Sequence, residues 1–114
     1  MPYLKIQTNE SLAAEQTAAL LTRASSLVAD LLGKPERYVM VAVDAGAPML
    51  FAGGDAPAAY LELKSIGLPE SMTPKLSAGL CTLMQEALGV DRERVYIEFH
   101  DAARAMWGWN GGTF

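Results

Sequence analysis

Two stretches decide the fold of this chain, "LLGKPERYVMV" at residues 31–41 and "ALGVDRERVYI" at residues 87–97, because they repeat one pattern. Each closes an apolar helical run with leucine and glycine, crosses a short charged link, and enters a run of strand-forming residues. Glycine after the last helical turn is a typical helix stop, and the run that follows is typical of a strand. An internal duplication of about half of the chain is the simplest explanation.

The first copy extends from this stretch back to the start of the chain. "YLKIQT" at residues 3–8 alternates apolar and polar side chains, which predicts a half-buried strand. Apolar residues then recur at helical spacing over residues 11–32, and "YVMVAV" at residues 38–43 is continuously apolar. A continuous apolar run predicts a strand in a parallel pair that is covered on both faces. Residues 3–43 therefore form a first β-α-β unit.

The second copy occupies residues 60–100. It predicts a strand at "YLELKSIG", a helix at "TPKLSAGLCTLMQEALG" with Pro74 in its first turn, and a strand at "RVYIEFH". Between the copies, residues 44–59 are rich in glycine and proline and predict a loop, with a short strand at "MLF".

Together the copies predict an α/β (α+β) fold in one domain over residues 1–114. Right-handed crossovers place both helices on one face of a four-stranded sheet and leave the other face bare. Within the chain only "DAARAMWGWNGGTF" at residues 101–114 remains to cover it. We therefore expect a homo-oligomer, with residues 101–114 as a C-terminal interface segment.

Composition limits the partners and the setting. The formal net charge is −4, the pI is about 4.8, and no lysine or arginine run is present, so we expect no nucleic-acid and no membrane partner. Cys81 is the only cysteine, in an apolar stretch of the second predicted helix, and reads as a buried, unreactive thiol. With no signal peptide in the first residues, a cytoplasmic protein is expected, and non-classical secretion stays compatible with the sequence.

Pro2 raises a specific chemical question. A small second residue permits removal of Met1, which leaves a free proline nitrogen held on a rigid ring. The pKa of an α-amine is ordinarily about 7.7–8.0, and burial lowers it, so a buried terminal amine becomes a neutral base. Pro2 alone does not decide the matter, since many chains begin with Met-Pro. Lys34 alone is better explained as a solvated cation near a helix end than as a substrate-binding residue.

Four short motifs settle the resemblance by their order and spacing: "GKP" at 33–35, "SIG" at 65–67, "RVYI" at 94–97 and "GWNGGTF" at 108–114. With the duplication and Pro2, the whole chain resembles the macrophage migration inhibitory factor and D-dopachrome tautomerase family of the tautomerase superfamily. The resemblance implies a homotrimer with active sites between adjacent subunits. It also implies keto–enol tautomerisation, an isomerase reaction, with Pro2 as catalytic base and with no metal or other cofactor.

The resemblance further implies a set of substrate-binding residues: Lys34, Ser65, Ile66, Tyr96, Glu98, Trp107 and Phe114. Lys34 and the backbone N–H of Ile66 would bind the substrate carboxylate or carbonyl. Tyr96 and Glu98 would come from a neighbouring subunit, and with His100 they share one face of their strand by alternation. Trp107, Trp109 and Phe114 would form an aromatic wall.

The expected substrate is a small, phenylpyruvate-like α-keto acid or an aryl enol. Glu98 stands where familiar members of the family carry asparagine, so its carboxylate is expected to weaken binding of acidic substrates or to raise the pKa of the Pro2 base. The bulk of Trp107 is expected to narrow the pocket mouth. Two other functions stay open: a cytokine-like, protein-binding homotrimer with weak or no catalytic activity, and a structural assembly subunit. The sequence identifies no protein partner.

Overall fold

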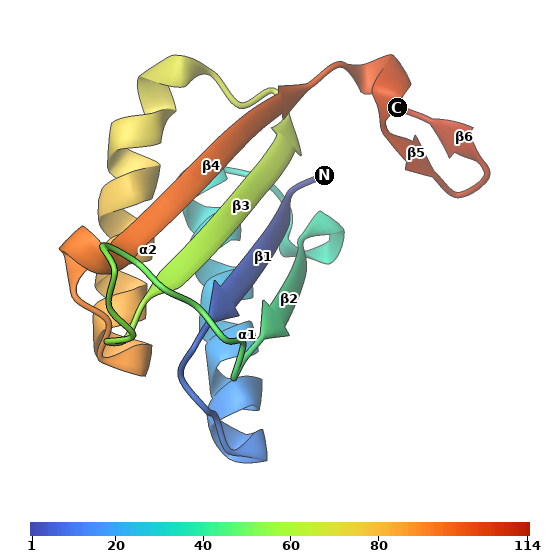
Figure 1. Ribbon diagram of the computed structural model, residues 1–114. Helices are drawn as coiled ribbons and strands as arrows, with labels where there is room; N and C mark the ends of the chain where they lie inside the picture. The colour runs from blue at the N-terminus through green and yellow to red at the C-terminus, as the bar shows by residue number, and fades with distance from the viewer.

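The computed structural model describes residues 1–114 and contains both predicted β-α-β units (Figure 1). The first unit consists of β1 (Tyr3–Thr8), α1 (Ala14–Leu32) and β2 (Met40–Asp44). The second consists of β3 (Ala59–Ile66), α2 (Thr73–Leu88) and β4 (Val95–Ala102). The predicted α/β fold is confirmed, and α1 begins three residues later than the sequence pattern suggested.

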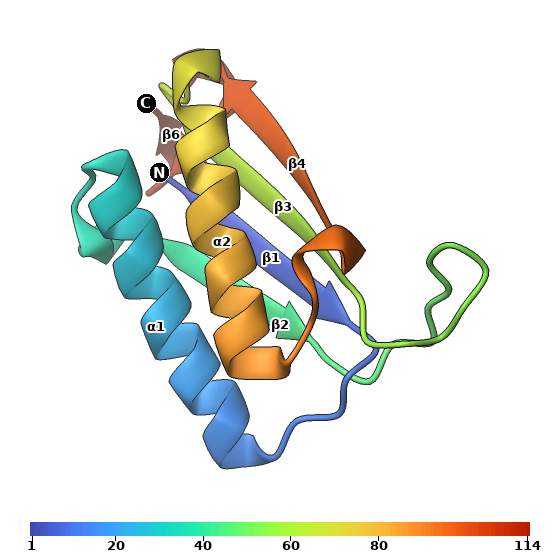
Figure 2. The same cartoon turned by 90° about the vertical axis from the view of Figure 1, so that its left-hand side faces the viewer.

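The four strands of the two units form one mixed sheet with the strand order β2-β1-β3-β4. Strands pair in parallel within each unit, β1 with β2 and β3 with β4, while β1 and β3 join the units in antiparallel orientation. Both helices cover the same face of the sheet, and the opposite face carries no helix (Figure 2). This arrangement confirms the expected right-handed crossovers and leaves the polar side chains of the strands uncovered within the protomer.

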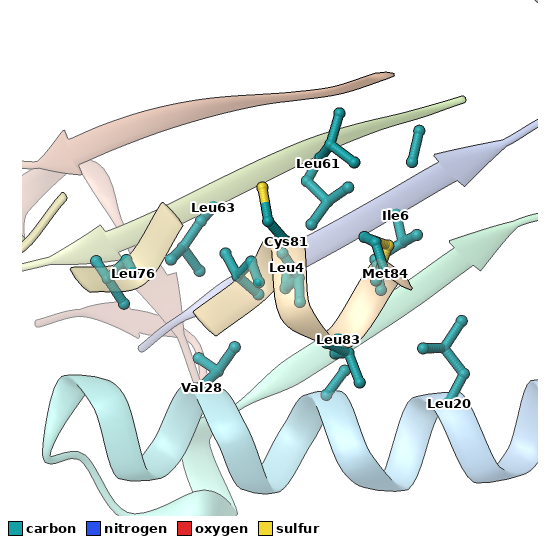
Figure 3. Close-up of a cluster of buried hydrophobic side chains, with 14 of the residues drawn as sticks. Leu4, Ile6, Leu20, Val28, Leu61, Leu63, Leu76, Cys81, Leu83 and Met84 are labelled. Carbon is teal, nitrogen blue, oxygen red and sulfur yellow. The ribbon is translucent and has the colours of Figure 1, made fainter. Parts of the chain in front are cut away.

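The core lies between this sheet and the two helices (Figure 3). Leu4 and Ile6 of β1 and Leu61 and Leu63 of β3 are fully buried, as alternation requires. They pack against apolar side chains of both helices. Cys81 of α2 belongs to the same cluster and is 8% exposed, which confirms the predicted buried thiol. Burial of this apolar surface is the main stabilising contribution to the sheet that positions the site.

The prediction that the strand at 38–43 is covered on both faces is wrong within the protomer. β2 begins only at Met40, pairs with β1 alone, and leaves Met40 65% exposed. The physical reason is that the second unit attaches to the other side of β1, so β2 is an edge strand of a sheet with helices on one face only.

The predicted strand at "MLF" is also wrong, because the loop between the units closes on itself. Phe51 and Gly54 exchange two backbone hydrogen bonds of 3.0 Å and form an isolated bridge. Arg94 then donates to the carbonyls of Phe51, Gly54, Ala56 and Pro57 at 2.9 to 3.3 Å. With these carbonyls satisfied inside the loop, no partner strand forms.

The C-terminal residues form a small hairpin that the sequence pattern did not predict. β5 (Gly108–Trp109) pairs with β6 (Gly112–Thr113) after a 3-10 turn at Arg104–Met106. Asn110 and Gly111 connect them with φ values of 51° and 79°, as a tight hairpin turn of type I′ requires. The hairpin lies at the end of the sheet where the N-terminus also lies (Figure 1). No helix in the structure is both long and apolar enough to cross a membrane.

Candidate active site

Pro2 lies directly before β1, and its side chain is less than 2% exposed. Its carbonyl oxygen accepts a hydrogen bond of 3.0 Å from the backbone N–H of Met40, at the start of β2. The residue is therefore held by the two adjacent parallel strands of the first unit. This attachment fixes the direction of the proline ring and of its nitrogen.

A cavity of about 540 Å³ opens beside Pro2, and it is lined mostly by apolar and aromatic side chains. Three segments build it: the N-terminus, the link between α1 and β2, and the C-terminal hairpin. The lining residues are Met1, Pro2, Tyr3, Arg37, Tyr38, Val39, Met40, Trp107, Gly108, Trp109 and Phe114. A concave, mainly apolar space with a few polar groups is the usual form of a small-molecule site.

Aromatic rings form one wall of this cavity. The Tyr38 ring meets Trp109 edge-on, with centroids 5.8 Å apart, and Trp109 stacks on Phe114 at 5.5 Å. Such pairs stabilise each other beyond the area they bury. The backbone N–H of Phe114 donates to the carbonyl of Trp107 at 3.2 Å, which ties the end of the chain to the hairpin. The structure thus brings the predicted Trp107, Trp109 and Phe114 to the cavity of Pro2.

Lys34 reaches the site through the turn that ends α1. Gly33 adopts φ 64°, in the left-handed region, and the N–H of Lys34 then closes the helix on the carbonyl of Ala29 at 3.0 Å. From this position the Lys34 ammonium donates to the carbonyl of Ile66 at 2.7 Å. The local fold therefore connects the "GKP" and "SIG" motifs directly.

Ser65 and Ile66 lie at the end of β3, and Ile66 provides the carbonyl that Lys34 contacts. The hydroxyl of the fully buried Ser65 donates to the same Ile66 carbonyl at 3.0 Å. Gly67, with φ 68°, turns the chain immediately afterwards. Lys34, Ser65 and Ile66 thus form a cluster, but none of them lines the cavity itself. Substrate binding by these three residues stays a prediction.

The surroundings of the terminal amine favour its neutral form. Burial lowers the pKa of the Met1 amine below its ordinary value, and the positive charge of Lys34 lowers it further. Desolvation and a nearby cation each disfavour a protonated amine. The structure shows these two influences at the Met1 amine, one residue before Pro2.

Tyr96 and Glu98 do not join Pro2 within one protomer. In the register of the sheet, Tyr96 pairs with Tyr60, and Tyr60 pairs with Gln7 near the C-terminal end of β1. Gln7 lies five positions after Pro2, or about 17 Å along a strand. Tyr96 packs instead on Phe51, with centroids 4.8 Å apart. A contribution of Tyr96 to the Pro2 site would therefore have to come from another subunit.

Glu98 lies on the face of the sheet that carries no helix. Its carboxylate accepts a hydrogen bond of 3.3 Å from the hydroxyl of Tyr60. Burial, together with the nearby Glu98 carboxylate, raises the pKa of Tyr60. Glu98 also lines a second hollow of about 420 Å³, and Trp107 lines both this hollow and the cavity of Pro2. The Trp107 indole therefore stands between the two.

Sequence reasoning missed Arg37 and Tyr38. They lie in a 3-10 turn, Glu36–Tyr38, which the pattern only described as a charged link. This turn brings both side chains to the cavity, where the Arg37 guanidinium stacks on the Tyr38 ring at 4.8 Å. Their position directly after "GKP" is the one signal that could have identified them.

Fold and cavity together define a class of protein: a duplicated β-α-β fold with a buried proline beside an aromatic pocket. The sequence profile of the family "Macrophage migration inhibitory factor (MIF)" matches residues 1–114. The chain belongs to this family, and the resemblance seen in the sequence is confirmed.

Individual relatives agree with this assignment. A macrophage migration inhibitory factor homolog of Brugia malayi is 39% identical over 100% of this chain and 99% of that protein. The Mus musculus macrophage migration inhibitory factor is 34% identical, with the same coverage of both chains. Among solved structures, a homologue from Prochlorococcus marinus is 42% identical, with a TM-score of 0.93 over 98% of each chain. A macrophage migration inhibitory factor of Toxoplasma gondii is 34% identical, with a TM-score of 0.92.

Proposed function

We propose that this chain is a cofactor-independent keto–enol tautomerase, an isomerase acting on phenylpyruvate-like α-keto acids. Pro2 is the general base after removal of Met1. The observation that carries the proposal is the buried position of Pro2 beside an aromatic cavity, where burial and the Lys34 charge lower the pKa of a terminal amine. A base that is neutral near the working pH is suited to proton abstraction.

In the proposed step, the proline nitrogen accepts a proton from the carbon beside the substrate carbonyl. The electron pair of the broken C–H bond forms a carbon–carbon double bond, and the carbonyl oxygen takes up the negative charge. Transfer of a proton from water to this oxygen completes the enol, and the protonated Pro2 nitrogen returns its proton to water, so the reaction needs no electron donor or acceptor. Lys34, whose ammonium keeps further donors beyond its bond to Ile66, would stabilise the developing charge.

A homotrimer with shared sites is part of this proposal. The sheet face without helices needs a cover, and Tyr96 is too far from Pro2 to act on the site of its own protomer. Three-fold assembly would place Tyr96 and Glu98 at the cavity of a neighbour, as the family resemblance implies. We place the protein in the cytoplasm, where a reducing environment suits the free thiol of Cys81.

The test compares the parent with a variant that carries one alanine inserted between Met1 and Pro2. We expect the parent to accelerate tautomerisation of phenylpyruvate, and the insertion to reduce kcat/KM by about 100-fold or more, because the proline nitrogen becomes an amide. Mass spectrometry confirms that the parent begins at Pro2, and thermal unfolding confirms that the variant folds. Equal rates for the two proteins, or none for either, would contradict the proposal.

The second candidate is a cytokine-like, protein-binding homotrimer with weak or no catalysis. Relatives named macrophage migration inhibitory factor, 34% identical in Mus musculus, favour it. Mass spectrometry also separates the two functions. Retention of Met1 would leave Pro2 without a basic nitrogen and would favour the binding protein.

A further inference from the structure

Arg37 is a cation without a partner at the cavity. The structure contains one ion pair, between Arg23 and Glu86 at 2.7 Å, and no hydrogen bond involves the Arg37 side chain. Its guanidinium instead lies over the Tyr38 ring at 4.8 Å and lines the cavity beside Pro2. A stacked guanidinium keeps the N–H donors at its edge free, and that edge matches a carboxylate in shape.

Within one protomer no side-chain carboxylate lines the cavity; Glu98, which the proposed trimer brings to it, belongs to a neighbouring subunit. Among the lining residues Arg37 is the only one with a charged side chain. Its neighbour Glu36 lines a different hollow, against α1, together with Leu21, Thr22, Ser25 and Val41. The whole chain carries a net charge of −4, so attraction of an anion to this cavity has to be local.

The site therefore offers two separate cations. Lys34 is fixed on the Ile66 carbonyl, close enough to the N-terminus to lower the pKa of its amine. Arg37 is fixed on Tyr38, whose ring meets the Trp109 and Phe114 rings of the cavity wall. An aromatic ring held by this wall would place one end toward Pro2 and Lys34 and present its other end to Arg37.

We propose that Arg37, supported by Tyr38, is a second anion subsite, and that the preferred substrates are aryl α-keto acids with a second carboxylate on the ring. This inference rests on the proposed tautomerase function for the reacting end of the substrate. Arg37 binds the remote carboxylate and sets specificity, while Lys34 serves the carboxylate or carbonyl beside the reacting carbon.

The first test measures binding without turnover. Isothermal titration calorimetry at low salt compares cinnamate with 4-carboxycinnamate, neither of which can tautomerise. We expect the dicarboxylate to bind the parent roughly fivefold more tightly, the size of effect expected for an accessible ion pair. Arg37→Gln removes this preference. Arg104→Gln, which removes another exposed arginine that does not line the cavity, retains it.

The second test measures kcat/KM for phenylpyruvate and 4-carboxyphenylpyruvate. Arg37→Gln is expected to lower the value for the carboxylated substrate roughly fivefold more than for phenylpyruvate. An equal loss for both substrates would show that Arg37 binds a group common to them, and would overturn the second subsite. An unchanged binding preference in Arg37→Gln would overturn it as well. Turnover of neither substrate, with the binding preference present and dependent on Arg37, would overturn the tautomerase proposal and support the subsite.

Discussion

Two links connect a helix to the strand that follows it, at residues 33–39 and 89–95. They have the same backbone conformation, but their side chains have different roles. In both, a glycine ends the helix with nearly the same φ, 64° at Gly33 and 67° at Gly89. In both, a 3-10 turn follows, at Glu36–Tyr38 in the first link and Arg92–Arg94 in the second, and the next strand begins within two residues of it. The duplication has therefore conserved the local structure of the connection.

The side chains at matching positions go to different places. Lys34 extends to the Ile66 carbonyl beside Pro2, whereas its counterpart Val90 is fully buried in the core. Tyr38 joins the aromatic wall, whereas its counterpart Arg94 binds the carbonyls of the loop at 51–57. The first link supplies the candidate site, and the second supplies packing and loop anchoring. The two links therefore have the same backbone conformation, and the identity of their side chains alone accounts for their different roles.

An exchange of the residues that follow the two glycines should give the largest effects. Val90→Lys puts a charge into the core and should lower the free energy of unfolding by about 3 kcal/mol or more. Lys34→Val should change it by only about 1 kcal/mol, yet reduce kcat/KM for phenylpyruvate roughly 100-fold, since it removes the cation at the reacting end. Urea unfolding and steady-state kinetics measure the two quantities, with Val90→Ile as the matched control. Similar losses in the free energy of unfolding for Val90→Lys and Lys34→Val would contradict the different roles of the two links.

The two arginines of the second link should differ in their contribution to the free energy of unfolding, but by a smaller amount. Arg94→Gln removes donors to four loop carbonyls and should destabilise the protein by about 2 kcal/mol. Arg92→Gln removes exposed contacts with α2, chiefly a 2.6 Å bond to the Thr82 hydroxyl, and should destabilise it by less than about 1 kcal/mol. Urea unfolding of both variants measures this difference in destabilisation. An equal effect would show that Arg94 does not anchor the loop.

Replacement of the two glycines should give the smallest and most nearly equal effects. Gly33→Ala and Gly89→Ala should each lower the free energy of unfolding by about 1 kcal/mol, because alanine disfavours a left-handed backbone. A Cβ at either position would meet no atom within 4 Å, so no clash distinguishes them. Unfolding curves that differ by much more than the error of the fit would show that the two links are not equivalent in their backbone.

Much of the fold could be predicted because each element carries its own periodic pattern. Leu4 and Ile6 alternate with polar residues in β1, and Gly33 and Gly89 mark the helix ends. The hairpin at the C-terminus was missed although Asn110 and Gly111 form a typical turn pair, since strands of two residues have no periodicity to detect. The edge position of β2 depends on the order of the strands in the sheet, and no local pattern encodes that order.

The candidate site, like the fold, contains residues that the sequence suggested and residues that it did not. The sequence suggested Pro2 from its place after Met1, Lys34 from "GKP" and Phe114 from "GWNGGTF", and their roles in the site stay a prediction. Arg37 was missed because its place after "GKP" is the only sequence signal it carries, and the 3-10 turn sets the direction of its side chain. The place of Tyr96 depends on a neighbouring subunit, which neither the sequence pattern nor the geometry of one protomer supplies.

The most direct test of the account is an NMR titration of the Pro2 nitrogen in ¹⁵N-proline-labelled protein, parent against Lys34→Val. We predict that this nitrogen titrates with a pKa below that of an ordinary N-terminal proline. In Lys34→Val the pKa should rise part of the way back, because the cation is gone while burial, the larger cause, remains. The acid limb of kcat/KM should move to higher pH by the same amount. A nitrogen that does not titrate, or one with an ordinary pKa in both proteins, would contradict the account.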